Sequence, residues 1–379
     1  MSGGRSTRVT DSNWGRSPWD ADPGLARTNL REHVEVAVIG AGLTGVSAAY
    51  HLARRGVGVA LLDAGTVGAG ASGRTGGLVL EGTAAGNLEG VAACVDTLRH
   101  VVDEAEIACD LRLGGVWELE HRRGPSPCAA LWPDGETMLC IAGREPGGSV
   151  DAGALLRGLA VAAHRAGAAI HEHVAVQAIE PDATILLRTT GGTMRAEHVI
   201  VALGAYVTSL VPLPVPITPA LTLALATAPL SDAALGDMGL EARDPFYTTD
   251  LPYLWGRVVA DGRLILGAGL VHPTDGDVRS LTLGDTVVRE SLCRLETRVR
   301  GLHPALARTE ITARWGGPIA FRRGAVPIVA RLPGASPVIT CTAYAGHGIA
   351  LGVRVGQLVS EAIVDGVALP AWGEMRAAQ

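Results

Sequence analysis

One stretch of the chain, residues 36–63, constrains its fold more than any other. It begins with the apolar run Val36–Ile39, which has the composition of a parallel strand buried on both faces. Gly40, Gly42 and Gly45 follow in G-x-G-x-x-G spacing, and a second apolar run comes after a helix-like segment. The order therefore predicts a strand, a glycine turn, a helix and a second strand that ends in an acid.

Each part of this pattern has a role in binding a dinucleotide. The first glycine permits a tight turn, the second lets the backbone approach a pyrophosphate, and the third lets the helix pack on the strand. The pyrophosphate would lie at the start of the helix expected from Leu43 to Arg55, where free N–H groups and the helix dipole favour negative charge. Asp63 is positioned to bind a ribose hydroxyl. A glycine-rich turn without a ligand is the alternative, but strands, helix and acid together favour the dinucleotide.

Composition excludes several classes of protein. At 379 residues, with 47% apolar and 18% charged residues, the chain is long enough for one or two globular domains. A net charge of −6 argues against a nucleic-acid partner, because such partners are bound mainly through cations. No apolar run reaches the ~18 residues that span a bilayer, and residues 1–30 lack the apolar core of a signal peptide. We therefore expect a cytoplasmic protein with no membrane association.

The metal-binding and nucleophilic residue types give no motif. No cysteine pair forms C-x-x-C, so we expect reduced thiols and no metal site. His171 and His173 would share one face of a strand, but no third ligand is evident nearby, so we expect exposed polar positions. The chain contains no lysine and all 32 cations are arginines, which excludes a Schiff-base lysine and a lysine beside a cofactor. The cysteines lie at positions 94, 109, 128, 140, 293 and 341.

Periodicity divides the rest of the chain into two regions. Helical spacing of apolar residues predicts helices over residues 87–107, 151–167 and 285–300 and after residue 349. Strands are expected over residues 221–227, 253–259 and 263–270, and Asp261-Gly262 is a hairpin signal. This second region therefore indicates a separate, antiparallel sheet. Before it, Trp14 and Trp19 suggest that part of an otherwise loosely attached leader packs on the body.

Three later features favour FAD over NAD. A second glycine cluster, residues 70–77, follows the acid almost at once, and a flavin needs such backbone because its rigid rings lie along the same crevice. A strand over residues 199–204 has a small-residue exit that would close against the cofactor. The chain then returns with a strand over residues 337–341, a Gly-His-Gly turn and a helix. The start of that helix would face the pyrimidine end of a flavin, where negative charge develops on reduction.

At these residues the chain resembles the FAD-dependent amine and amino-acid oxidases of the D-amino-acid oxidase superfamily, which includes glycine oxidase and sarcosine oxidase. It is most similar to γ-glutamylputrescine oxidase-like members. The resemblance rests on residues 36–63, 70–77, Trp315-Gly-Gly317 with Pro327, and 346–348, and more weakly on residues 153–210 and 262–269, so that it covers most of residues 31–366.

The resemblance implies an α/β fold: a Rossmann-like FAD-binding domain with a second, mostly antiparallel β-sheet substrate domain. It implies contacts with FAD from both glycine clusters, the acid, two single residues and the C-terminal turn. The domain limits are 1–30 for the leader, 31–84, 146–215 and 315–379 for the discontinuous FAD-binding domain, and 85–145 and 216–314 for the substrate-binding domain. The FAD contacts are Gly40, Gly42, Leu43, Thr44, Gly45, Asp63, Ala64, Ser72, Gly73, Arg74, Thr75, Gly76, Gly77, Val174, Gly204, Gly346, His347, Gly348, Ile349 and Ala350.

The chain departs from the family in four places. Asp63 replaces the commoner glutamate, and Thr75 and Leu78 stand where relatives often carry Asn and Gln. No cysteine lies between Trp315 and Pro327, where some sarcosine oxidases attach flavin covalently, so we expect noncovalent FAD. Some relatives use a lysine near the flavin to promote oxygen reduction, and this chain has none.

Five residues are candidates for catalysis or substrate binding: His347, Tyr253, Trp255, Arg257 and Trp315. Tyr253, Trp255 and Arg257 would share one strand face, which suits a substrate with an apolar body and a carboxylate, whereas a face packed on the interior is the alternative. His347 either bonds the flavin or fixes its turn, and Trp315 would wall the pocket.

The resemblance implies a flavoprotein oxidase that takes a hydride from the carbon next to an amine nitrogen, gives an imine and reduces oxygen to hydrogen peroxide. The partners expected are therefore a small amine or amino acid and molecular oxygen. Two alternatives remain open: a dehydrogenase that uses another electron acceptor, and a noncatalytic FAD-binding subunit. The sequence predicts neither the identity of the amine nor the oligomeric state.

Overall fold

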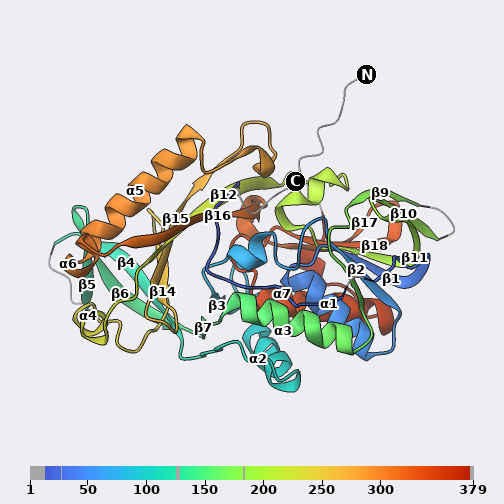
Figure 1. The fold of residues 1–379 in the computed structure, drawn as a ribbon, viewed down its shortest axis with the longest axis horizontal. Coiled ribbons are helices and arrows are strands. Elements are labelled where there is room, and N and C mark those ends of the chain that lie inside the picture. The colour runs from blue at the N-terminus through green and yellow to red at the C-terminus, as the bar shows by residue number, and fades with distance from the viewer. Residues whose placement is uncertain (1–12, 27, 125–128, 182–183, 376–379) are drawn as a thin grey trace.

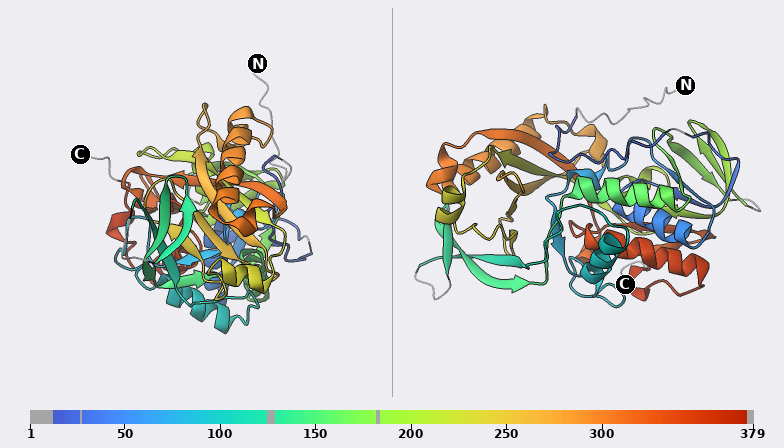
Figure 2. Two further views of the ribbon diagram at one scale, coloured as in Figure 1. Left: turned by 90° about the vertical axis from the view of Figure 1, so that its left-hand side faces the viewer. Right: turned by 60° about the horizontal axis from the view of Figure 1, so that its bottom comes forward.

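The computed structural model describes residues 13–26, 28–124, 129–181 and 184–375. Two large sheets form two lobes that lie side by side along the long axis of the molecule (Figure 1). Each sheet has its own hydrophobic core, and the right-hand view of Figure 2 again shows the two lobes side by side. The chain passes between the lobes several times, so neither lobe is one continuous segment.

The first sheet is parallel at its centre, as the glycine motif predicts. β1 pairs in parallel with both β2 and β11, and its residues 36–39 are buried because helices cover one face and further apolar chain the other. The strand order is β17 (Ile328–Leu332), β18 (Ala335–Thr342), β11 (Gly192–Val201), β1 (His33–Ile39), β2 (Val59–Leu62) and β8 (Ala169–His171), with β10 (Ile185–Thr189) and β9 (Val176–Glu180) continuing antiparallel from β11.

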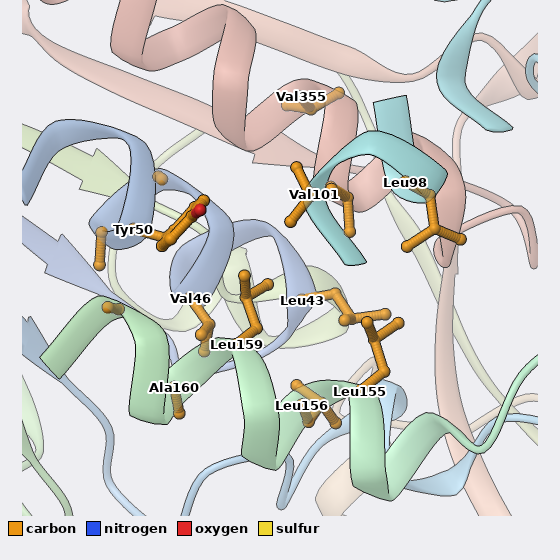
Figure 3. Packing of buried hydrophobic residues seen from close by; sticks show 14 of the residues in the cluster. Leu43, Val46, Tyr50, Leu98, Val101, Leu155, Leu156, Leu159, Ala160 and Val355 are labelled. Carbon is orange, nitrogen blue, oxygen red and sulfur yellow. The ribbon is translucent and has the colours of Figure 1, made fainter. Parts of the chain in front are cut away.

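Four helices pack together against this sheet: α1 (Leu43–Arg54), α2 (Cys94–Glu104), α3 (Ala152–Arg165) and α7 (Ala350–Val364). Figure 3 shows Leu43 and Val46 of α1 beside Leu155 and Leu159 of α3. The two helices α1 and α7 approach closely, since a Cβ on Gly356 would lie 2.5 Å from Cβ of Ser47. These contacts fix the start of α1, where the glycine turn ends.

The second sheet is mostly antiparallel, and only β13 and β4 run parallel. Helix α5 (Thr286–Leu302) lies on the outside of this lobe, and its buried face packs in the same core as β12 and β15 (Figure 1). The strand order is β16 (Ile311–Phe321), β12 (Thr218–Thr227), β15 (Leu264–Val271), β14 (Trp255–Val258), β13 (Phe246–Thr248), β4 (Val116–Arg122), β6 (Thr137–Glu145) and β5 (Ala130–Asp134).

The smaller elements connect the two lobes or close their ends. They are β3 (Leu78–Leu80), β7 (Gly147–Ser149), α4 (Asp232–Asp237), α6 (Pro304–Ala307) and the 3₁₀ helices η1 (Ala71–Arg74), η2 (Gly204–Ser209), η3 (Val278–Ser280), η4 (Arg323–Ala325) and η5 (Ala371–Gly373). Within the described residues, no helix is long and apolar enough to cross a membrane.

Two expected boundaries of helices and strands are corrected. The helix expected from residue 87 begins only at Cys94, because the residues before it form turns with positive φ at Gly86 and Gly90. Tyr253 precedes β14 instead of lying on it. The strand that contains residue 315, β16, pairs with β12 as far as Phe321. The expected domain limits stay predictions.

Five of the six cysteines lie within the described residues. There the cysteines 94, 109, 140, 293 and 341 form no disulfide, and no group of side chains has the composition of a metal site in that part of the chain. Cys128 and residues 1–12 of the expected leader lie outside the described residues. The described part of the leader packs on the body, as Trp14 is fully buried.

Candidate functional site

The turn between β1 and α1 is so tight that Gly40 and Gly45 accept no side chain, and Gly42 is closely packed. Gly40 has a φ of +107°, and a Cβ there would lie 2.5 Å from the carbonyl oxygen of Ala202. A Cβ on Gly45 would lie 1.9 Å from the carbonyl oxygen of Gly40, and one on Gly42 would lie 3.0 Å from Oγ of Ser72. Close backbone approach to a ligand is the structural use of such a turn.

The N-terminus of α1 fits a phosphate group. Its N-cap is Gly42, which supplies no side-chain cap, and its first turn carries no acidic residue. The N–H of Leu43 donates to Oγ of Ser72 at 3.0 Å, so the second glycine cluster packs directly on this turn. Uncapped N–H groups at a helix start attract anions through their donors and through the helix dipole.

Asp63 joins the end of β2 to the glycine turn. Its Oδ2 accepts the N–H of Ala41 at 2.7 Å, and its Oδ1 accepts the N–H of Gly65 at 2.8 Å. Burial raises the pKa of Asp63, while these two N–H groups act in the opposite direction. A carboxylate has about four acceptor sites, so lone pairs remain for a ribose hydroxyl. The carbonyl of Asp63 accepts the N–H of Val174 at 2.7 Å, which brings that expected contact to the same edge of the sheet.

Strand β14, which we call the roof strand, packs directly against the second glycine cluster, residues 70–77. A Cβ on Gly76 would lie 2.2 Å from Cζ3 of Trp255, and one on Gly77 would lie 2.5 Å from Nη1 of Arg257. The Nη1 of Arg257 donates to the carbonyls of Gly77, at 3.0 Å, and of Val150. Trp255 and Arg257 thus lie on one face of the strand.

Tyr253, the third residue expected on this face, lies apart from the other two. It precedes β14, and 54% of its surface is exposed. A strand period of two applies only within a strand, so it does not hold for a residue before the strand begins.

Arg257 is a buried cation without a carboxylate partner among the described residues. Only 2% of its surface is exposed, its Nε has no hydrogen-bond partner, and no acidic oxygen of the described chain lies within ion-pair distance. Burial lowers the pKa of Arg257 to about 10, so the guanidinium still carries its charge at pH 7. A buried charge is costly unless it is paired, which makes this position suited to an anionic group.

Two other candidate residues contact backbone. The indole Nε1 of the fully buried Trp315 donates to the carbonyl of Arg74 at 3.0 Å, so this side chain supports the second glycine cluster. The backbone N–H of His347 donates to the carbonyl of Tyr344 at 3.0 Å, and its Nδ1 is buried without a partner. Burial lowers the pKa of His347, so its imidazole is neutral at pH 7.

The C-terminal turn lies beside the start of α1. The hydroxyl of Tyr344 is 3.1 Å from Oγ1 of Thr44, and a Cβ on Gly352 would lie 3.2 Å from that same Oγ1. At the end of β18, the hydroxyl of Thr342 donates to the carbonyl of Gly204 in η2 at 2.8 Å. Segments that are far apart in sequence therefore meet around the carboxyl ends of the parallel strands, where open α/β sheets bind ligands.

Comparison with known proteins agrees with this arrangement. Residues 35–362 match the family described as FAD dependent oxidoreductase (DAO). The chain belongs to this family. As an FAD-dependent oxidoreductase it has relatives over most of its length, among them the probable oxidoreductase OrdL of Haemophilus influenzae, 27% identical over 383 residues that cover 88% of this chain and 83% of the relative. The gamma-glutamylputrescine oxidoreductase of Escherichia coli is 26% identical over 371 residues, which cover 86% of this chain and 83% of that one.

Solved structures share the fold of this oxidoreductase. The L-proline dehydrogenase of P. horikoshii superimposes with a TM-score of 0.74 at 20% identity, covering 90% of this chain and 96% of that one. The glycine oxidase of Geobacillus kaustophilus superimposes with a TM-score of 0.72 at 21% identity, covering 92% of this chain and all of the other. The resemblance to the D-amino-acid oxidase superfamily and the expected α/β fold are confirmed.

Sequence reasoning missed one aromatic residue beside the second glycine cluster of this FAD-dependent oxidoreductase. Tyr206 of η2 has a buried hydroxyl without a partner, and its ring stacks on Trp14 with centroids 6.4 Å apart. A Cβ on Gly70 would lie 3.8 Å from Cε2 of Tyr206, so this ring lies beside the second glycine cluster. The only sequence signal was the pair Trp14 and Trp19, which predicts that part of the leader packs on the body but not where it packs.

The expected role of Asp63 is testable by exchange of its carboxylate. Asp63→Ala should weaken FAD binding roughly 10- to 150-fold, because a charge-assisted hydrogen bond to ribose is lost. Asp63→Asn keeps the shape and one accepting oxygen, so it should fall between Ala and the parent. Titration of the apoprotein with FAD measures the affinity, and turnover at saturating FAD should change less. An FAD affinity unchanged in both variants would show that Asp63 does not bind the ribose.

Proposed function

We propose that this FAD-dependent oxidoreductase is an amine or amino-acid oxidase with noncovalently bound FAD. Bound FAD would supply the acceptor for a hydride from the carbon next to the amine nitrogen and the route for the electrons to oxygen, so that the products would be an imine and hydrogen peroxide. The relative from Escherichia coli, named for gamma-glutamylputrescine, supports an amine as substrate. The absence of a cysteine between Trp315 and Pro327 supports noncovalent binding.

The single observation that carries this proposal is the pair Trp255 and Arg257 on the second glycine cluster. The indole offers an apolar wall, and the unpaired guanidinium offers a fixed positive charge. An amine that also carries a carboxylate satisfies both, because its carboxylate supplies the missing counter-charge.

The choice between oxygen and another acceptor depends on positive charge beside the flavin site. Electron transfer to oxygen creates superoxide, and a nearby cation lowers the barrier for that step. The chain has no lysine, and His347 is neutral at pH 7, so Arg257 is the cation that we propose for this role. The second candidate function, a dehydrogenase with another acceptor, follows if Arg257 does not act on oxygen.

Separate measurement of the two half-reactions tests the proposal. Acid precipitation should first release the yellow colour into the supernatant. Anaerobic mixing with amines should then bleach the flavin, and an amine bearing a carboxylate should bind at least ~10-fold more tightly than the same amine without it. Stopped-flow reoxidation by oxygen should be faster than for free reduced flavin. It should also be constant between about pH 7 and 8, since Arg257 stays charged and His347 is neutral there.

Each outcome has a distinct meaning. Colour that stays in the precipitate contradicts noncovalent binding. Failure of every amine to bleach the flavin contradicts the substrate class. Reoxidation as slow as that of free reduced flavin contradicts the oxidase and favours the dehydrogenase. A reoxidation rate that rises below about pH 6.5 would identify an imidazole such as His347 as the cation in place of Arg257.

A further inference from the structure

Residues 13–20 lie outside the region that matches the family, and yet they contact both lobes. The carbonyl of Trp14 accepts the N–H of Gly316 in β16 at 2.8 Å. The carbonyl of Asp20 accepts a hydrogen bond from Nη1 of Arg157 in α3 at 2.7 Å. We call residues 13–20 the N-terminal strap, because they cross from the second lobe to the first.

Between these two ends, the strap bonds to the second glycine cluster. Oγ of Ser17 donates to the carbonyl of Gly73 at 2.7 Å. Nε1 of Trp19 donates to the carbonyl of Thr75 at 2.6 Å. Both acceptors belong to the segment that the fold brings under the roof strand β14. Each bond joins a side chain to a backbone group 56 positions away, so neither arises from local turn geometry.

Side-chain donors from three parts of the chain form hydrogen bonds with the backbone carbonyls of residues 73–77. Nε1 of Trp315 donates to the carbonyl of Arg74. Nη1 of Arg257 donates to the carbonyl of Gly77, which also accepts the N–H of Val150. With the two strap residues, side-chain donors hold the carbonyls of Gly73, Arg74, Thr75 and Gly77. Orientation of these peptide planes is therefore imposed from outside the cluster.

The orientation matters for the N–H groups of the same peptides. In a trans peptide the C=O and N–H bonds point in opposite directions. Since the carbonyl of Thr75 points to Trp19, the N–H of Gly76 points away from the strap, and it makes no hydrogen bond with any residue that the structure describes. A backbone donor that is held in place and left free is suited to a ligand acceptor.

Trp19 also contacts the buried cation of the roof. The guanidinium Cζ of Arg257 lies 5.6 Å from the centroid of the Trp19 ring, within the distance of a cation–π contact. One side chain thus contacts both the backbone of the second glycine cluster and the charged group that we place beside the flavin.

We propose that the N-terminal strap is a positioning element of the FAD site, and that Trp19 and Ser17 are its positioning residues. They hold the peptide groups of residues 73–76 so that the N–H of Gly76 is presented to the cofactor. The inference rests on the proposed function only in taking the second glycine cluster as part of the FAD site. It does not depend on the substrate or on oxygen.

Conservative variants test this without removing the strap. Trp19→Phe keeps an aromatic ring against Arg257 but lacks the N–H donor, and Ser17→Ala lacks the hydroxyl. Each should weaken FAD binding roughly 2- to 12-fold, as for the loss of one hydrogen bond. Backbone amides of residues 73–77 should exchange hydrogen faster in the variants, with and without FAD, and the flavin absorption spectrum should shift in the holoenzyme. Trp117→Phe is the matched control, because no acceptor of the described residues is bonded to the Trp117 Nε1.

The results separate the inference from the function on which it rests. Weaker FAD binding and faster exchange in Trp19→Phe and Ser17→Ala, with Trp117→Phe unchanged, support the strap. If the parent binds FAD and both strap variants bind it equally well with unchanged exchange, the strap has no positioning role. If the parent itself does not bind FAD, the cofactor site proposed for residues 70–77 is refuted. An equal loss of FAD binding in the Trp117 control would point to general destabilisation and would also overturn the inference.

Discussion

Replacement of Gly45 by alanine is expected to abolish FAD binding and to lower the free energy of unfolding by at least about 3 kcal/mol. The added Cβ would lie 1.9 Å from the carbonyl oxygen of Gly40 and 3.3 Å from Cγ1 of Val38. The first of these neighbours is backbone, so no change of rotamer relieves the overlap. Strand β1 and helix α1 must separate, and the glycine turn between them then loses its shape.

Gly301→Ala is the matched control for this experiment. Gly301 lies in α5, and nothing approaches within 4 Å of a Cβ built there. Because glycine is a poor helix former, this exchange should leave FAD binding intact and stabilise the protein by up to about 1 kcal/mol. Urea unfolding and FAD titration of both variants measure the two effects. Wild-type FAD affinity in Gly45→Ala would show that the turn does not bind the cofactor.

The glycine turn can be predicted from the sequence because its constraints are local. Gly40 has a positive φ, and Gly45 excludes a Cβ through the carbonyl oxygen of nearby Gly40, so their spacing alone indicates the turn. The start of α3 is equally local: Asp151 accepts the N–H of Ala154 at 2.9 Å as a helix cap. The pair Asp261-Gly262 lies between β14 and β15, as its hairpin signal predicts.

The limits of β16 could not be predicted in this way. Trp315-Gly-Gly317 has the composition of a loop, since glycine weakens a strand. In the structure Trp315 pairs with Ala224 of β12, and a Cβ on Gly316 would lie 2.9 Å from the side chain of Leu221. Glycine is required there because a neighbouring side chain occupies the space. That requirement depends on a strand about 90 residues earlier, and no local pattern reports it.

The candidate site shows the same division between local and distant constraints. The strand period of two correctly predicted that Trp255 and Arg257 share one face of β14. It did not predict which residues that face contacts. The bond from Arg257 to Gly77 spans 180 positions, and the bond from Trp14 to the carbonyl of Leu281 spans 267. Hydrogen bonds from side chains to distant carbonyls leave no periodic pattern in the sequence, so the sequence does not predict the contacts of the strap.

A second large effect is expected at a buried ionic cluster in the second lobe. His121 contacts two carboxylates, with Nε2 2.9 Å from Oδ2 of Asp134 and Nδ1 2.6 Å from Oδ1 of Asp250. Arg298 of α5 donates to Asp134 through Nε at 3.1 Å and, through Nη1, to the carbonyl of Tyr253 at 2.8 Å. The side chains of His121 and Asp134 are each 9% exposed. The cluster therefore ties α5 to the chain that leads into the roof strand β14.

Asp134→Asn should destabilise the protein by about 3–5 kcal/mol at pH 7, because it leaves the largely buried charge of Arg298 without its carboxylate partner. Asp232→Asn is the control. Asp232 also pairs with an arginine, Arg243, but its side chain is 93% exposed, so this exchange should change stability by less than about 1 kcal/mol. Urea unfolding measures both differences.

The same cluster predicts a dependence on pH with a definite sign. Burial raises the pKa of Asp134, but hydrogen bonds from Arg298 and His121 outweigh burial and hold the pKa below its usual value. A carboxyl whose folded pKa is depressed contributes stability above its unfolded pKa, near ~3.9, and the contribution is lost as pH falls through the folded pKa. The parent and Asp134→Asn should therefore differ fully at pH 7 and converge below about pH 4. A difference that stays constant from pH 7 to pH 3, or one below about 1 kcal/mol at pH 7, would show that the charge of Asp134 does not stabilise this lobe.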